Sequence, residues 1–196
     1  MIKRKDFYFK RAKREGFLAR SAYKLVDLNK RYNLIKRDCD VLDIGCSPGS
    51  WVQVCLKLNV RRVVGIDIEK AKIENNKFEF VNKDVNEINV NSLGKFDVVL
   101  SDISPKTKGF FDSEESVELS RKAWKIAMQV LKPKGNFLCK IFQGAEFDEF
   151  CREIRKHFYF FKVSKPKASR KESREMYLIG KGFLGNLQNI DKKIYK

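Results

Sequence analysis

Apolar runs alternate with amphipathic segments along most of the chain. The pattern predicts strands at residues 40–45, 62–67, 77–82, 96–102 and 135–142. It predicts helices at residues 21–32, 50–58, 114–131 and 146–157. Because strands and helices alternate, we expect an α/β fold with a mostly parallel sheet and helices on both of its faces.

The last two apolar stretches, 158–163 and 176–180, are separated by a basic loop instead of a helix. This connection predicts one antiparallel edge strand, which brings the expected sheet to seven strands. We expect a basic arm at 1–20, one domain at 21–182 and a polar tail at 183–196.

Several residues have predicted structural roles. Ser21 is expected to cap the first helix, and Pro133 and Gly135 are expected to stop the long helix before the next strand. We expect Trp51, Trp124 and the phenylalanines of 158–161 to pack in the core.

The segment Asp40-Val-Leu-Asp-Ile-Gly-Cys-Ser-Pro-Gly-Ser50 carries the first functional signal. It predicts a buried strand, a glycine-bearing turn and a helix that opens near Trp51. Gly45 and Gly49 lack a Cβ, so the turn is expected to let the backbone approach a ligand closely. Asp67 ends the next strand, at the position from which ribose hydroxyls are commonly bound. A nucleoside cofactor is therefore expected.

The turn differs from that of a dinucleotide site, which requires Gly-x-Gly-x-x-Gly. Asp43, Asp67 and Asp84 would surround the predicted site, and three acids repel a pyrophosphate. They suit a cationic ligand that carries an amino group, a ribose and an adenine, as S-adenosylmethionine does. A strand–turn–helix without any ligand is the alternative.

Five segments together resemble the FtsJ/RrmJ family of RNA ribose 2′-O-methyltransferases, and they do so in order from about residue 15 to about residue 182. The segments are Arg20-Ser-Ala-Tyr-Lys-Leu25, Asp43-Ile-Gly-Cys-Ser-Pro-Gly-Ser-Trp51, Ser101-Asp102-Ile-Ser-Pro105, Lys140-Ile-Phe-Gln-Gly144 and Ser173-Arg-Glu-Met-Tyr177. The resemblance implies a Rossmann-like methyltransferase fold that depends on S-adenosylmethionine. The segments Phe-Gln-Gly and Lys-Pro-x-x-Ser-Arg are similar to those of the branch that methylates uridine in large-subunit rRNA.

The resemblance also implies a set of cofactor-binding residues. The turn would cradle the methionine part, Asp67 would take the ribose and Asp84 the adenine. The whole expected set is Asp43, Gly45, Cys46, Ser47, Pro48, Gly49, Ser50, Trp51, Asp67, Ile68, Asp84, Val85 and Asp102. Aspartates that follow strands often cap turns instead, and this alternative applies most to Asp84.

Methylation of a sugar hydroxyl needs a base, and a neutral lysine can serve when its surroundings disfavour the ammonium form. Lys140 closes an apolar strand at the edge of the sheet where ligands gather. With Lys24, Asp102 and Glu175 it matches the catalytic Lys-Asp-Lys-Glu tetrad of the family. Two departures from the family pattern are Ser50 for glycine and Lys106 for asparagine.

The net charge of the chain indicates a binding partner. Lysine and arginine number 42 against 25 acids, giving a net charge of +17, and such an excess favours nucleic acid as the partner. Basic residues gather with aromatic ones in the N-terminal arm and again at 162–174. The expected RNA-binding residues are Arg20, Lys24, Lys106, Lys165, Arg170 and Arg174.

Composition excludes other classes. There is no apolar run of the roughly 20 residues that a membrane helix needs, and no signal peptide is recognisable. Five cysteines form no C-x-x-C pair, and His157 is the only histidine, so no metal site is expected. These features favour reduced thiols and a cytoplasmic monomer.

Three functional hypotheses follow: an RNA ribose 2′-O-methyltransferase, a non-catalytic RNA-binding module, and a nicotinamide-linked oxidoreductase. The complete tetrad argues against the second and the missing glycine pattern against the third. Within the first, the rRNA or its ribosomal particle is the expected substrate. The anticodon loop of a tRNA is the alternative, and an mRNA cap comes third.

Overall fold

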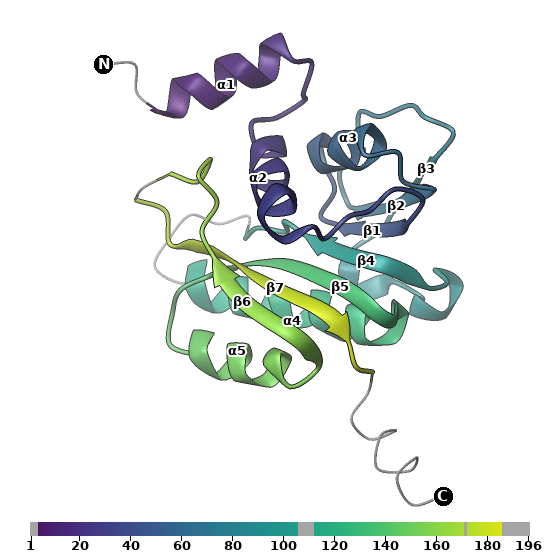
Figure 1. Cartoon of the computed structure of the whole chain (residues 1–196), viewed down its shortest axis with the longest axis vertical. Helices are drawn as coiled ribbons and strands as arrows, with labels where there is room; N and C mark the ends of the chain where they lie inside the picture. The colour runs from purple at the N-terminus through teal and green to yellow at the C-terminus, as the bar shows by residue number, and fades with distance from the viewer. Residues whose placement is uncertain (1–3, 106–111, 171, 186–196) are drawn as a thin grey trace, which may run out of the picture.

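The computed structural model describes residues 4–105, 112–170 and 172–185 as one α/β domain (Figure 1). Its helices are α1 (Arg4–Arg14), α2 (Ala22–Tyr32), α3 (Ser50–Lys57), α4 (Asp112–Val130) and α5 (Phe147–Arg155). Its strands are β1 (Asp40–Ile44), β2 (Arg62–Asp67), β3 (Phe78–Asn82), β4 (Phe96–Ser101), β5 (Leu131–Phe142), β6 (Phe158–Ser164) and β7 (Glu175–Phe183).

The seven strands form one sheet in the order β3-β2-β1-β4-β5-β7-β6. The first five positions are parallel, and β7 pairs antiparallel with both β5 and β6. The predicted fold class is confirmed. The antiparallel strand is inserted between β5 and β6, so that β6 forms the edge of the sheet.

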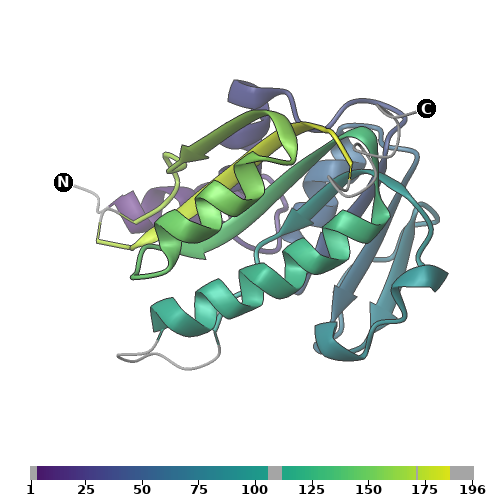
Figure 2. The same cartoon turned by 90° about the horizontal axis from the view of Figure 1, so that it is seen from below.

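Helices cover both faces of the sheet. In Figure 1, α2 and α3 lie over one face, and the view from below in Figure 2 shows α4 and α5 over the other. The first layer buries Leu25, Leu28 and Trp51 against the sheet. The second buries Trp124 and Phe150. The chain leaves β1 toward β2 on one side and later returns to β4 on the other, which creates a switch point at the carboxyl ends of β1 and β4.

Sequence patterns placed most elements within a few residues, but some residue roles were wrong. Ser21 has helical dihedrals (φ −61°, ψ −22°) and makes no side-chain cap. Its hydroxyl instead lies 2.7 Å from the hydroxyl of Ser50, which joins α2 to α3. The helical segment of the N-terminal arm, α1, docks through Ala12 against Tyr23 and Ala168.

Pro133 and Gly135 do not end the long helix, because α4 already ends at Val130 and β5 begins at Leu131. They lie in an irregular stretch in which the pairing of β5 with β4 shifts its register. Lys134 there has a positive φ of 64°. This stretch accommodates a proline because the regular ladder is interrupted.

The aromatic run of β6 is only partly in the core. Phe158 is 5% exposed and packs against Trp124, as does Phe137. Tyr159 and Phe160 are 90% and 40% exposed. Side chains of a strand alternate between its two faces, and β6 has a neighbour on one side only, so part of the run meets solvent.

Strand β1 begins with an ion-pair cluster, in which the buried Asp40 meets partly exposed cations, at the end of the sheet opposite its carboxyl ends. Asp40 accepts hydrogen bonds from Arg61 and, at 3.0 Å, from Lys132. Arg61 and, against the cost of burial, Lys132 lower the pKa of Asp40 to about 2. The cluster joins β1 to β5 and to Arg61, the residue before β2, and therefore contributes to stability.

We expect Asp40→Asn to lower the free energy of unfolding at pH 7 by about 2 kcal/mol, following from the lowered pKa. Because folding lowers the pKa of Asp40, its contribution to the free energy of unfolding is complete above the pKa of the unfolded state near 4. This contribution is lost as the pH falls to about 2. Urea unfolding at pH 7 and at pH 2 measures both. Asp38→Asn is the matched control, because the Asp38–Arg37 pair is at least 75% exposed and contributes little. Equal losses in the two variants would contradict the prediction.

Candidate functional site

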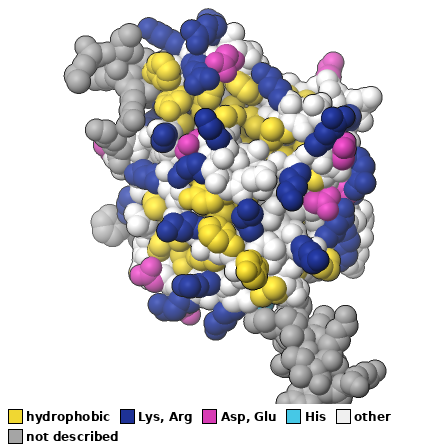
Figure 3. Space-filling model, viewed as in Figure 1, with side chains coloured by type: hydrophobic (Ala, Val, Ile, Leu, Met, Phe, Trp, Pro, Cys, Tyr) yellow, Lys and Arg dark blue, Asp and Glu magenta, His cyan; other side chains and the backbone are white. Residues whose placement is uncertain are grey.

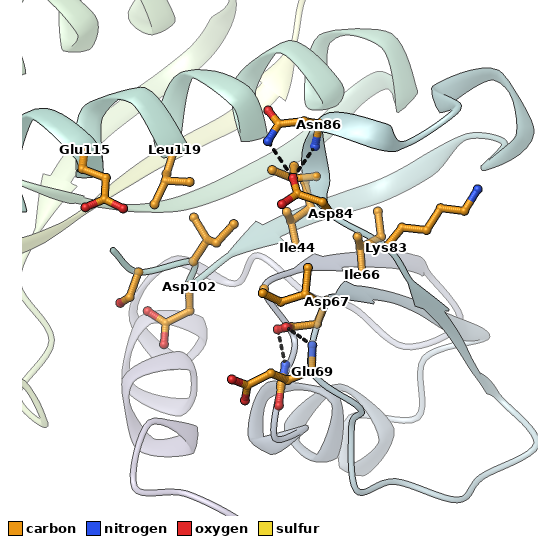
Figure 4. A pocket seen from close by; sticks show the side chains of 16 residues that line it. Ile44, Ile66, Asp67, Glu69, Lys83, Asp84, Asn86, Asp102, Glu115 and Leu119 are labelled. Carbon is orange, nitrogen blue, oxygen red and sulfur yellow. Dashed lines mark hydrogen bonds between the residues drawn. The ribbon is translucent and has the colours of Figure 1, made fainter. Parts of the chain in front are cut away.

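A cavity of about 610 Å³ opens at the switch point, at the carboxyl ends of β1 to β4 (Figure 4). This volume is in the range of small-ligand and cofactor sites. Figure 4 shows Asp67, Asp84 and Asp102 approaching it from three different strand ends, with Glu115 and Leu119 contributed by α4. The cavity is thus lined by acids from several elements and by apolar side chains such as Ile44 and Ile66.

The predicted cofactor residues divide into two groups. Those that line the cavity are Gly45, Ser47, Asp67, Ile68, Asp84, Val85 and Asp102. Those that do not line it are Asp43, Cys46, Pro48, Gly49, Ser50 and Trp51. Lining residues that sequence reasoning missed include Glu69, Lys83, Asn86, Ile103, Ser104, Glu115 and Leu119.

The glycines of the turn serve the protein's own packing. A Cβ on Gly45 would lie 2.9 Å from the Cα of Ile103, and one on Gly49 would lie 2.4 Å from Ile73. Both have positive φ, 79° and 112°. Each glycine therefore lets the turn lie close to another segment of the chain, and its close approach to a ligand stays a prediction. Gly45 still lines the cavity, and its missing side chain lets the turns after β1 and β4 lie side by side.

Two of the cavity acids are held by backbone amides. Asp67 accepts hydrogen bonds from the amides of Ser47 (2.8 Å) and Glu69 (2.9 Å), drawn as dashed lines in Figure 4. Asp84 accepts from the amide and the side chain of Asn86 and so caps a short 3₁₀ helix. The capping role considered for Asp84 is thus present, and the carboxylate lines the cavity as well.

Asp43 is fully buried, and neither of its carboxylate oxygens has a hydrogen-bond partner among the described residues. Burial, together with the negative charges of Asp102 and Asp67, raises the pKa of Asp43 well above its usual range. Both of those acids line the cavity. A buried carboxyl without a partner is costly, and this one adjoins the lining residue Ile44 without lining the cavity itself.

The predicted catalytic residues meet beside the cavity. Lys140 is 3% exposed, and its amine donates to the backbone oxygen of Asp102 (2.6 Å) and lies 3.2 Å from the carboxylate of Asp102. Lys24, from α2, pairs with Glu175 at 2.7 Å. The register of β5 and β7 explains the grouping, because Lys140 is opposite Tyr177 and Phe142 is opposite Glu175.

Two contacts of this cluster were not predicted. The Lys140 amine also donates to the hydroxyl of Ser104. The Tyr177 hydroxyl donates to the Asp102 carboxylate at 2.7 Å. Burial alone would raise the pKa of Asp102, but Lys140, Lys24 and the Tyr177 hydrogen bond together lower it, so Asp102 stays ionised. Both Ser104 and Tyr177 belong to sequence segments already noted, but only the fold shows their contacts.

A second hollow of about 550 Å³ lies on the other side of the Lys24–Glu175 pair. Arg20, Arg170 and Arg174 line it, with Phe142 at its wall. Of the other predicted RNA-binding residues, Lys165 donates to the backbone oxygen of Ser173, and Lys106 lies outside the described residues. The hollow places cationic side chains beside the predicted catalytic cluster.

Basic and apolar side chains share the face that carries α1, α2 and β6 (Figure 3). Phe7 and Phe9 of α1 are 52% and 61% exposed. Among the described residues no helix is both long and apolar enough to span a bilayer. The same residues contain no cluster of acids, histidine or cysteines suited to a metal ion.

Comparisons with known proteins agree with this geometry. The sequence model of the FtsJ-like methyltransferase family matches residues 17–183. A ribosomal RNA large subunit methyltransferase E from Archaeoglobus fulgidus is 43% identical over 194 residues, covering 93% of this chain and 98% of that protein. The protein of the same name from Brachyspira hyodysenteriae is 40% identical, with coverage of 93% and 98%.

Solved structures show the same fold. A putative ribosomal RNA methyltransferase from Plasmodium falciparum has a TM-score of 0.75 and 28% identity, covering 87% of this chain and all of that one. A putative hemolysin from Streptococcus thermophilus has a TM-score of 0.68 at 14% identity, covering 86% of this chain and 68% of that one. The second likeness concerns the fold alone.

Proposed function

Since the chain belongs to the FtsJ-like methyltransferase family, we propose that it methylates a ribose 2′-hydroxyl of a uridine in large-subunit rRNA. In this proposal S-adenosylmethionine is the donor. The observation that carries it is the grouping of Lys140 and Lys24 around Asp102, which lines the acidic cavity, while Lys24 also lines the arginine-lined hollow. One space suits the donor, the other suits RNA, and the buried Lys140 amine contacts a residue of the first.

The cavity residues fit S-adenosylmethionine, which supplies an electrophilic methyl group on a sulfonium when bound. Asp43 has unused acceptor capacity for an ammonium group, but it is fully buried and does not line the cavity, so the proposed contact requires the turn after β1 to shift when the cofactor binds. Asp67 and Asp84 each keep free lone pairs that could accept from ribose hydroxyls and from an adenine amino group. The remaining predicted contacts, from Cys46 to Trp51, rest on the family resemblance.

The catalytic step needs a base for the ribose hydroxyl, and Lys140 is the proposed one. Asp102 holds the amine through two contacts and is itself oriented by Tyr177. Lys24 and Glu175 form an ion pair next to this group and face the second hollow. We infer that they position the target nucleotide, while alignment of hydroxyl and methyl supplies much of the rate.

The test is to map 2′-O-methyl positions in rRNA and tRNA from cells with and without the protein. Purified protein is then given S-adenosylmethionine with free rRNA, ribosomal subunits or tRNA. Loss of one uridine methylation in large-subunit rRNA, restored in vitro, supports the proposal. Loss at a tRNA anticodon loop would transfer it to the alternative substrate. Absence of transfer to any RNA would leave a non-catalytic binding module. The expectations of a cytoplasmic location and a monomer accompany the proposal.

The arginines of the second hollow provide a prediction for RNA affinity. The double variant Arg170→Glu and Arg174→Glu should weaken RNA binding at least 10-fold at 0.1 M salt. It should also make the negative slope of log affinity against log salt shallower by about 1–2. Both side chains are exposed and line the hollow. The control is Lys125→Glu, which makes the same charge reversal at one exposed residue of α4. If the control weakened RNA binding as much, the hollow would not be the RNA site.

A further inference from the structure

Lys140 has all of its donors engaged. A lysine ammonium carries three protons, and three acceptors surround the Lys140 amine. They are the backbone oxygen of Asp102 at 2.6 Å, the carboxylate of Asp102 at 3.2 Å and the hydroxyl of Ser104. The side chain of Lys140 is only 3% exposed. A charged Lys140 in this arrangement has no lone pair with which to accept a proton.

The three acceptors differ in what they can do when the amine loses a proton. A backbone oxygen cannot donate a hydrogen bond, and the Asp102 carboxylate is held ionised by Lys140, Lys24 and Tyr177. A hydroxyl can both accept and donate. Ser104 is therefore the partner of this amine, among the described residues, that can reverse its role.

Ser104 also connects the Lys140 amine to solvent. Ser104 is exposed, whereas Lys140 is buried, and Ser104 lines the acidic cavity with Asp102 and Ile103. Resting on the proposed function, we propose that Ser104 is a positioning residue for the Lys140 amine and the hydroxyl through which the amine exchanges its proton with solvent.

The proton balance of one turnover is simple. The 2′-hydroxyl gives its proton to the neutral Lys140 amine, and its oxygen bonds to the methyl carbon. The carbon–sulfur bond breaks, and its electron pair stays on sulfur. The ammonium then gives one proton to the Ser104 oxygen, while the hydroxyl proton of Ser104 passes to solvent water. Both side chains return to their starting state.

Several charged or titratable groups face this amine and contribute to any pH dependence. Asp102 contacts it from the end of β4. Tyr177, on β7, donates to Asp102. Lys24 of α2 and Glu175 of β7 form the neighbouring ion pair. None of these is altered by a change at Ser104, so variants at this position isolate the hydroxyl.

The test compares Ser104→Thr with Ser104→Val, two side chains of nearly equal volume that differ in the hydroxyl. Single-turnover transfer is measured at saturating cofactor and RNA across pH. We expect the threonine variant to stay within about 5-fold of wild type and the valine variant to fall about 100-fold, the scale of proton-transfer catalysis. Calorimetry should show the same cofactor affinity in the two variants, because threonine and valine fill nearly the same space at the cavity wall.

A second readout does not depend on activity. Nuclear magnetic resonance of lysine-labelled, cofactor-free protein gives the exchange rate of the Lys140 ammonium protons with water. Exchange should be at least 10-fold slower with valine than with threonine. Equal transfer and exchange rates in the two variants would overturn the role of Ser104. If wild type transferred no methyl group to RNA, the proposed function would fail, and the exchange rates would still decide about Ser104.

Discussion

Lys140→Ala is expected to reduce the single-turnover rate of methyl transfer by about 10²–10⁴-fold, the usual contribution of a general base. Lys140→Arg should be nearly as slow, because a guanidinium stays protonated and cannot accept the hydroxyl proton. Cofactor affinity should change little in either variant, since the amine contacts Asp102 and Ser104 and is not among the lining residues of the cavity. Rates are measured at saturating cofactor and affinities by calorimetry.

Lys132→Ala is the matched control for this prediction. Lys132 lies on the same strand as Lys140, near its opposite end, and it pairs with Asp40 and Asp97. Its loss should lower stability while leaving the transfer rate of folded protein near that of wild type. Robust transfer by Lys140→Arg would exclude a lysine base and leave alignment of the reactants as the source of the rate.

Asp43→Asn is expected to separate cofactor binding from stability. Loss of the carboxylate should weaken S-adenosylmethionine binding by about 10–100-fold, because a charge-assisted hydrogen bond contributes about 1.5–3 kcal/mol. The same change should stabilise the cofactor-free protein. Asn matches the size of a carboxylic acid and carries no charge into the buried position that Asp43 occupies.

The sign of this stability change follows from the raised pKa of Asp43. A carboxyl whose pKa is raised by folding binds more protons in the native state, so stability falls as the pH rises above its unfolded value near 4. Asparagine has no such dependence. We expect the melting temperature at pH 7 to rise by at least about 2 °C and the difference to vanish near pH 3. Weaker binding without stabilisation would mean that Asp43 has partners that the structure does not show.

The parallel part of the fold could be predicted because its signals are local. Buried strands such as β1 are short and rich in β-branched and other apolar residues, and each is followed by a helical pattern or a turn. Asp67 and Asp102 were placed together correctly, because the carboxyl ends of parallel strands meet at one edge. Lys140 was noticeable as a charged residue in the apolar second half of β5.

The unpredicted features depend on pairings between distant segments. Glu115 reaches the cavity because of how α4 crosses the sheet, and nothing in its own sequence indicates this. Tyr177 contacts Asp102 because β7 pairs with β5 in one particular register. Glycine is required at position 49 because the side chain of Ile73 fills the space that a Cβ there would take. A single sequence does not specify such pairings in advance.

The insertion of β7 between β5 and β6 has a consequence for how the protein is made. All lining residues of the acidic cavity lie between positions 44 and 119, so they leave the ribosome early. Glu175 and Tyr177 are synthesised much later, and both are needed around Lys24 and Asp102. A growing chain therefore carries its complete set of cavity residues before it has a complete catalytic cluster. Only when the last strand has entered the sheet is the proposed catalytic cluster complete beside the cavity.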